Sequence, residues 1–124
     1  YVGIEGVEAF AQAAERKQHR NYTIVRGDFL RDPKRLFVGA DAAVYCGSLN
    51  TLSVEEFYQT LRRAFDAAAE ALVFNFLSSP KLAAAKYLTW HEPADVMSFL
   101  RSLSSRCEQL SDYHDGDCTA IAWK

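Results

Sequence analysis

Two carboxylates follow the first two apolar runs of the chain, where they could hold a ligand between them. Glu5 comes directly after Tyr1–Ile4, and Asp28 comes shortly after Tyr22–Val25. A carboxylate at a strand end can accept hydrogen bonds from both hydroxyls of a ribose, and a second one can accept from the amino group of an adenine. Each has a neighbouring glycine, which would let the backbone approach a flat ligand. The pattern favours a nucleoside-like ligand.

Both acids also have ordinary interpretations. Glu5 precedes a predicted helix, where the helix dipole favours an acid at the N-cap or in the first turn. Asp28 lies in a Gly-Asp segment, where aspartate is a common turn residue. In open parallel sheets, however, ligands bind beyond the carboxyl ends of the strands. Two acids at successive strand ends therefore favour the ligand interpretation.

The first elements alternate between β and α patterns. Tyr1–Ile4 and Tyr22–Val25 are rich in β-branched and aromatic residues, which predicts two strands. The segment between them is predicted to form a helix that ends near 19–21. Its apolar residues recur at the spacing of one helix face, at Val7, Phe10, Ala11 and Ala14.

Two further strands enclose a longer helix. Ala42–Cys46 and Ala71–Leu77 are nearly unbroken apolar runs, typical of strands that are buried on both faces of a parallel sheet. Ser53–Glu70 is predicted to be a helix, because Ser53 and Glu56 match a capping box. Its apolar face is formed by Phe57, Leu61, Phe65 and Ala68.

The last third of the chain changes in character. Lys81–Trp90 is alanine-rich and could hold a short helix, and Pro93 suits the first turn of another. The apolar face of that helix is predicted to be Val96, Phe99, Leu100 and Leu103. Two β-type segments, Cys107–Tyr113 and Cys118–Trp123, enclose Asp115-Gly116, a strong hairpin signal. The order predicts an α/β fold, a mostly parallel doubly wound sheet with helices on both faces and a C-terminal antiparallel hairpin.

Four segments together resemble the class I S-adenosylmethionine (SAM)-dependent methyltransferases, whose fold is Rossmann-like. Tyr1–Glu5 resembles the family's second strand, which ends in an acid that grips the SAM ribose. Arg26–Phe29 resembles the third-strand motif, in which the Asp meets the adenine amino group. Asp41–Gly47 resembles the fourth-strand motif. The terminal hairpin resembles the antiparallel last strand that distinguishes this family from NAD-binding Rossmann domains.

The resemblance covers essentially the whole chain and implies a set of cofactor contacts. SAM would be the cofactor, with Glu5 on the ribose and Asp28 on the adenine. The remaining cofactor-binding residues that it implies are Gly6, Val7, Phe29, Cys46 and Gly47. The family's glycine-rich GxGxG loop after its first strand is absent from the sequence. We expect upstream residues to carry it, with two alternatives. Another chain could donate the strand, or the two flanking strands could pair directly.

The methyl acceptor is not identified by the sequence. The resemblance implies acceptor contacts from Asn50, Tyr87 and His91, and it leaves the catalytic residues unknown. Asn50 has an alternative role as a turn or cap residue. His91 could be a general base, or an ordinary loop histidine that is partly exposed. The residues after the fourth-strand motif, 47–50, lack the Asn/Asp-Pro-Pro-aromatic sequence of amide and adenine methylases, which disfavours that subclass. We expect the acceptor to be a small molecule.

Composition excludes several other classes. The formal net charge of −2 argues against a nucleic-acid surface. No run approaches the roughly 20 apolar residues of a membrane span, and no signal peptide is visible. The three dispersed cysteines predict reduced thiols in a cytoplasmic protein and no metal site.

The sequence therefore predicts a single domain over residues 1–124, the core of a SAM-dependent methyltransferase that is incomplete at its N-terminus. The chain alone need not be active, and a homodimer is left open. Two alternatives remain: an NAD-binding Rossmann domain, and a Rossmann-like interaction module that has lost its cofactor.

Overall fold

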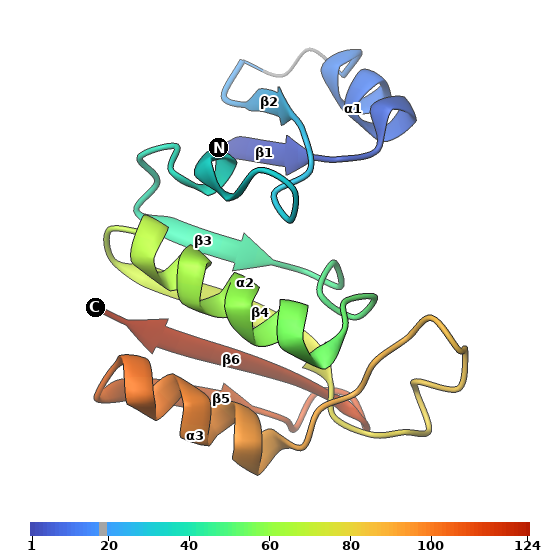
Figure 1. Cartoon of the computed structure of the whole chain (residues 1–124), viewed down its shortest axis with the longest axis vertical. Coiled ribbons are helices and arrows are strands. Elements are labelled where there is room, and N and C mark those ends of the chain that lie inside the picture. Colours follow the sequence, from blue (N-terminus) through green and yellow to red (C-terminus); the bar gives the residue numbers. More distant parts are fainter. Residues whose placement is uncertain (18–19) are drawn as a thin grey trace. The chain divides into compact units, whose positions relative to one another are not determined.

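The chain divides into two compact units, Tyr1–Ala40 and Asp41–Lys124 (Figure 1). The structure is a computed structural model that describes residues 1–17 and 20–124. Each unit has its own sheet, of two strands in the first unit and four in the second. The expectation of a single domain over residues 1–124 stays a prediction.

The first unit is built around a β–α–β arrangement. Strands β1 (Val2–Glu5) and β2 (Thr23–Arg26) pair in parallel, with Glu5 opposite Arg26. Helix α1 (Glu8–Glu15) connects them, and a short 3-10 helix, η1 (Pro33–Leu36), follows. Because the two strands are parallel, Glu5 and the Gly27-Asp28 turn leave the sheet at the same edge.

Helix α1 is shorter and more exposed than the sequence predicts. It ends at Glu15, whereas the expected end near 19–21 includes residue 19, which lies outside the described residues. Of the predicted apolar face, Ala11 is fully buried, but Phe10 is 63% exposed and Val7 51% exposed. The sheet that α1 covers has only two strands, so a full helix face cannot be buried on it.

The second unit combines parallel and antiparallel pairing. Its strands are β3 (Ala42–Tyr45), β4 (Ala71–Leu77), β5 (Arg106–Leu110) and β6 (Asp117–Trp123), and they lie in the order β3-β4-β6-β5. The β3–β4 pair is parallel, and β6 is antiparallel to both β4 and β5. The predicted terminal antiparallel hairpin is therefore confirmed, with β5 at the edge of the sheet.

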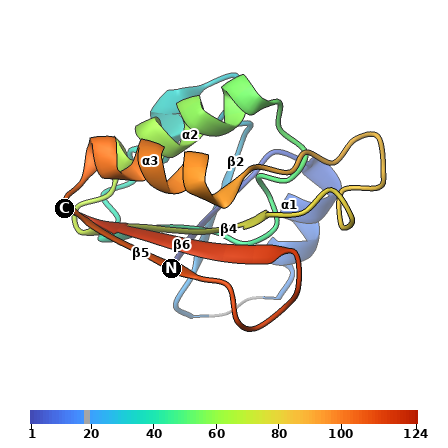
Figure 2. The same cartoon turned by 90° about the horizontal axis from the view of Figure 1, so that it is seen from below.

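Helices α2 (Val54–Ala67) and α3 (Pro93–Leu103) cover one face of this sheet (Figure 2). The core lies between the helices and that face. Phe57 of α2 meets the ring of Phe74 edge-on, with ring centroids 5.9 Å apart, and both side chains are almost fully buried. Such edge-to-face pairs add to the stabilisation from buried apolar area.

The opposite face of the sheet carries no helix of this unit. Val73 and Asn75 of β4 point to it and are half-buried, and Val44 of β3 is 66% exposed. The prediction that Ala42–Cys46 is buried on both faces is therefore wrong, because its partners cover only the face that carries Tyr45.

The ends of the two long helices follow the sequence signals. Ser53 Oγ accepts from the Glu56 N–H at 3.3 Å, and Glu56 Oε2 accepts from the Ser53 N–H at 2.9 Å, which completes the predicted capping box. Pro93 occupies the first turn of α3, as predicted. The predicted core residues of α2, Phe57, Leu61, Phe65 and Ala68, are all buried.

Two connections differ from the prediction. Residues 81–90 form turns and no helix. The first strand of the hairpin ends at Leu110 and not at Tyr113, so a wider loop replaces the tight Asp-Gly turn. Gly116 has φ of +84°, and a Cβ there would lie 3.1 Å from the Leu82 side chain. Close packing of residues 79–82 against this turn explains the glycine.

Candidate functional site

The side chain of Glu5 is fixed at the carboxyl end of β1. Its Oε1 accepts a hydrogen bond of 2.7 Å from the N–H of Val7, at the start of α1. Glu5 therefore contacts the N-terminus of α1, which agrees with the predicted alternative of an acid at the helix start. Among the described residues, Oε2 of Glu5 accepts no hydrogen bond. The carboxylate is thus oriented by the helix start and keeps an oxygen for a ligand.

Asp28 lies beside Gly6, the residue that follows Glu5, at the same edge of the β1–β2 sheet. The backbone of Gly6 packs against it, because a Cβ on Gly6 would be 3.5 Å from the Asp28 Cα. Asp28 Oδ1 accepts from the Leu30 N–H at 2.8 Å, and Oδ2 lies 3.5 Å from Nε of Arg31. The two predicted carboxylates therefore share one edge of the β1–β2 sheet, as expected. Val7 is exposed and Phe29 is half-buried.

Gly27 is required by a contact that the sequence analysis did not identify. Its φ is +149°, and a Cβ there would come 2.3 Å from Nε of Arg35. The Arg35 guanidinium crosses this turn to donate a 2.7 Å hydrogen bond to the carbonyl of Arg26. Arg35 also pairs with Asp32 at 3.2 Å. These contacts hold the turn that presents Asp28.

Arg26 ties α1 to the end of β2. Its guanidinium binds Glu8 at 2.6 Å and also pairs with Glu15. The hydrogen bond from Arg26 lowers the pKa of Glu15. Sequence spacing did not predict this pairing, because the partners come from different elements.

In the second unit, Cys46 and Gly47 follow β3. The Cys46 side chain is exposed. The N–H of Gly47 donates a 2.6 Å hydrogen bond to Asn75 Oδ1, from the neighbouring strand β4. Asn75 Nδ2 in turn points to the Asp117 carboxylate, with distances of 3.2 and 3.3 Å. The amide of Asn75 therefore fixes the backbone at the end of β3.

Asn50 and His91 come from two segments that meet. The carbonyl of Asn50 accepts a 2.8 Å hydrogen bond from the N–H of Thr89, two residues before His91. Asn50 Oδ1 and His91 Nε2 are both buried without a hydrogen-bond partner among the described residues. An unpaired buried acceptor is costly unless a ligand or water satisfies it. Tyr87, in contrast, is 71% exposed.

His91 lies in an aromatic environment and not on an exposed loop. It is 5% exposed, and its ring stacks on Phe57 with centroids 3.7 Å apart. Tyr58 and Phe76 also surround it. Burial lowers the pKa of His91, which favours the neutral imidazole. The alternative of a partly exposed loop histidine is therefore wrong.

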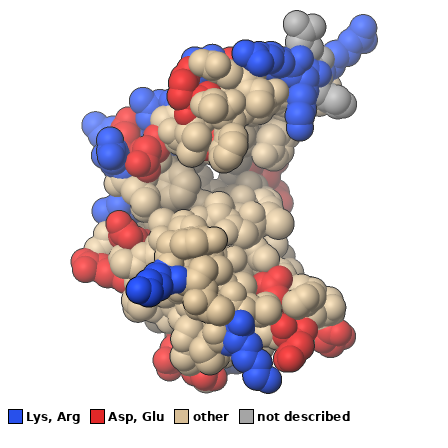
Figure 3. Space-filling view, turned by 90° about the vertical axis from the view of Figure 1, so that its right-hand side faces the viewer, with Lys and Arg blue, Asp and Glu red and all other residues tan. Residues whose placement is uncertain are grey.

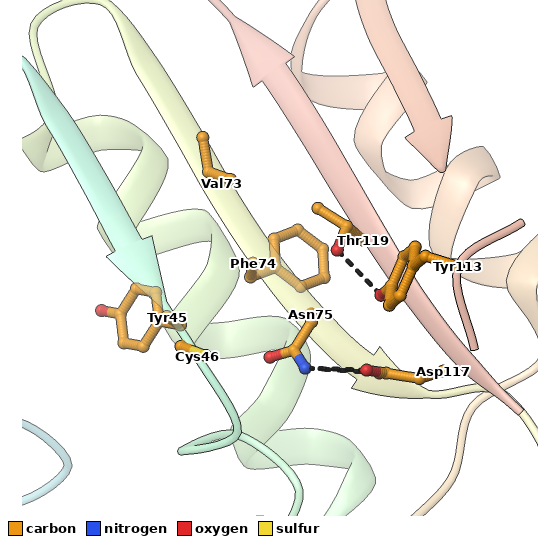
Figure 4. A pocket seen from close by; sticks show the side chains of 8 residues that line it. All are labelled: Tyr45, Cys46, Val73, Phe74, Asn75, Tyr113, Asp117 and Thr119. Carbon is orange, nitrogen blue, oxygen red and sulfur yellow. Dashed lines mark hydrogen bonds between the residues drawn. The ribbon is translucent and has the colours of Figure 1, made fainter. Parts of the chain in front are cut away.

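A pocket of about 360 Å³ opens on the helix-free side of the second unit (Figure 4). Cys46, Asn75 and Asp117 line it together with Tyr113 and Thr119 from the hairpin. The sequence alone does not single out Asn75, Tyr113, Asp117 or Thr119 as site residues. The available signal was that Asn75 and Thr119 interrupt apolar strands at positions that point away from the core.

Within the described residues, no cluster of three or more His, Cys, Asp or Glu side chains could hold a metal ion. None of the helices described is long and apolar enough to cross a membrane. Basic and acidic side chains both occur on the face shown in Figure 3, with much uncharged surface between them.

The fold is similar to solved structures of methyltransferases. Magnesium protoporphyrin IX methyltransferase from Synechocystis PCC 6803, with bound SAH, matches with a TM-score of 0.73 at 15% identity, over 99% of this chain and 63% of that one. An O-methyltransferase family protein from Burkholderia thailandensis matches with a TM-score of 0.78 at 14% identity, over 99% and 43%. The DhpI–SAH complex matches with a TM-score of 0.67 at 16% identity, over 97% and 63%.

These likenesses establish the fold. It is a mixed α/β, Rossmann-like fold with a C-terminal hairpin, the fold of class I SAM-dependent methyltransferases, as the sequence predicts. The chain spans 43–63% of the length of these three proteins. No protein-family model matches the sequence, and no curated protein matches it.

Proposed function

We propose that this chain, which has the fold of SAM-dependent methyltransferases, is the cofactor-binding part of an enzyme that methylates a small molecule. SAM, when bound, supplies an electrophilic methyl group on its sulfonium sulfur. The residues of the chain would bind and orient the cofactor. Alignment of acceptor, methyl group and leaving sulfur can supply most of the rate enhancement when the acceptor is already nucleophilic.

The observation that carries the proposal is the pair of carboxylates at one edge of the β1–β2 sheet. Glu5 is oriented through Oε1 and has Oε2 for the ribose hydroxyls. Asp28 is held by the Leu30 N–H on one oxygen, and the carboxylate can still accept from an adenine amino group. In this proposal the exposed Val7 and the half-buried Phe29 flank the adenine ring, beside the backbone of Gly6.

The remaining contacts rest on the same proposal. Cys46 and Gly47 would face the cofactor from the end of β3, where Asn75 fixes the Gly47 N–H. Asn50 would bind the acceptor through Oδ1, which has no partner among the described residues. Tyr87 would add an exposed ring, and His91 would support the segment that carries it. The thiols of Cys46, Cys107 and Cys118 are unpaired, which supports a cytoplasmic location.

Calorimetric titration of the intact protein tests this proposal. We expect saturable binding of SAM and of SAH, and no binding of NAD at the same concentrations. Binding of NAD without SAM would instead support a dinucleotide-binding domain. Absence of binding by SAM, SAH and NAD would support an interaction module that has lost its cofactor.

A further inference from the structure

The turn that follows β3 is held by a side chain from the neighbouring strand. The parallel β3–β4 ladder ends where Tyr45 lies opposite Phe74, whereas β4 continues to Leu77. Beyond that point, the N–H of Gly47 donates a 2.6 Å hydrogen bond to Oδ1 of Asn75. The side chain of Asn75 therefore takes the place of the next backbone partner and satisfies the N–H at the end of β3.

Gly47 begins a turn that carries two residues of the proposed site. Its φ is +72°, and a Cβ there would meet no atom within 4 Å, so the glycine is required by backbone conformation and not by space. The Gly47 carbonyl accepts a 3.4 Å hydrogen bond from the N–H of Asn50. The bond from the Gly47 N–H to Asn75 therefore anchors the start of the segment that leads from Gly47 to Asn50.

The Asn75 amide has a second partner on its other side. Its Nδ2 donates to the Asp117 carboxylate, with distances of 3.2 and 3.3 Å to the two oxygens (Figure 4). The bonds from Gly47 through Asn75 to Asp117 thus link the end of β3 to β4 and β6, which are neighbours in the sheet. All three residues belong to the second unit, so these bonds do not depend on what covers this face of the sheet.

The two partners require an amide at residue 75. Gly47 offers a donor and Asp117 offers an acceptor, so the side chain between them must accept on one side and donate on the other. Asparagine does both in a single orientation of its amide. A carboxylate there would face Asp117 with like charge. An apolar side chain would leave the Gly47 N–H without its partner.

We propose that Asn75 and Asp117 are positioning residues for the bound cofactor. This inference rests on the proposed function, in which Cys46 and Gly47 face SAM. Asn75 acts through the Gly47 N–H, and Asp117 acts through Asn75, because it holds the amide in the orientation that accepts from Gly47. Neither residue needs to touch SAM. The C-terminal hairpin, through Asp117, thereby contributes to cofactor affinity from two strands away.

A reciprocal exchange of amide and carboxylate tests this inference in the intact protein. Asn75→Asp, studied at pH 8 so that both carboxyls are ionised, should weaken SAM binding about tenfold, because the donor to Asp117 is lost and like charges meet. Asp117→Asn alone should have a smaller effect, since an amide oxygen still accepts from Asn75. The two substitutions together should restore SAM affinity to within about twofold of the wild type. The new carboxylate then accepts from both the Gly47 N–H and the new amide.

Two further measurements separate positioning from general stability. Thr119→Val changes the residue directly opposite Asn75, whose hydroxyl bonds Tyr113 and not Gly47, so SAM affinity should stay within about twofold. Hydrogen exchange of the Gly47 amide, measured without SAM, should be slow in the wild type and the double variant and faster in Asn75→Asp. If Asn75→Asp does not fold, a double variant that folds and binds SAM supports the inference, because Asp117→Asn then compensates for it.

Equal SAM affinity in Asn75→Asp and the wild type would overturn the inference. A double variant that binds SAM no better than Asn75→Asp would do the same, as would fast exchange of the Gly47 amide in the wild type. If the wild-type protein binds no SAM at all, the proposed function fails and this inference fails with it. A failure that is confined to the variants is therefore distinguishable from a failure of the proposed function.

Discussion

Single side chains at the strand ends make structural contacts that also orient groups of the proposed site. Glu5 uses one carboxylate oxygen to start α1, so its orientation does not depend on a ligand. The Asn75 amide likewise makes two contacts, because its Oδ1 accepts from the Gly47 N–H and its Nδ2 donates to the Asp117 carboxylate. The edge position of Glu5 and Asp28 was predictable, since parallel strands place their ends together. The partners of Asn75, Arg26 and Arg35 were not, because they come from elements distant in the sequence.

A substitution at Glu5 tests the binding role. In the intact protein, Glu5→Ala should weaken SAM affinity by about 1–3 kcal/mol, the range for loss of charged hydrogen bonds. Glu8→Ala is the matched control. Glu8 lies in the first turn of the same helix but pairs with Arg26, so SAM affinity should be nearly unchanged. Calorimetry that finds equal affinity for Glu5→Ala and the wild-type protein would remove Glu5 from the ribose-binding role.

His91 should make the protein less stable in acid. Burial lowers its pKa in the folded state, so below about pH 6.5 the unfolded state binds the proton more readily. The free energy of unfolding should therefore fall as pH drops below that point, by at most about 1.4 kcal/mol per pH unit. His91→Phe should remove this part of the slope in urea titrations at several pH values. His114→Gln, at an exposed position, should leave it. An unchanged slope in His91→Phe would contradict the assignment.

At the scale of elements, helices were predicted correctly where a periodic apolar face occurs together with a signal for the helix start. Helices α2 and α3 begin where a capping box and a first-turn proline indicate. Alanine content alone was not predictive for residues 81–90, because an isolated short helix is not stable in water. Instead, backbone bonds tie the end of this segment to its neighbours. Thr89 N–H donates to Asn50 at 2.8 Å, and His91 N–H donates to Leu77 at 2.9 Å.

The capping box gives a prediction for the stability of α2. Ser53→Ala removes the acceptor for the Glu56 N–H and should lower the free energy of unfolding by about 1 kcal/mol. Ser105→Ala, at an exposed position outside the helices, should change it by less than about 0.5 kcal/mol. Chemical denaturation of both variants checks this. Equal effects would show that the capping bonds do not stabilise the protein.

At the scale of the whole molecule, the order of elements indicated the fold class, while the pairing of the strands needed the structure. The strands form two sheets, β1-β2 in the first unit and β3-β4-β6-β5 in the second. The expectation that upstream residues supply the missing first strand stays a prediction, as do its two alternatives. Alternating β and α patterns predict which elements follow one another along the chain. They do not determine which strands pair side by side in a sheet.

The proposed function depends on binding of the adenosine part of SAM at the β1–β2 edge. A crystal structure of the intact protein with SAH tests it most directly. We expect the ribose hydroxyls to lie within hydrogen-bond distance of Glu5 and the adenine amino group within hydrogen-bond distance of Asp28. SAH bound elsewhere, with neither carboxylate in contact with the nucleoside, would contradict it.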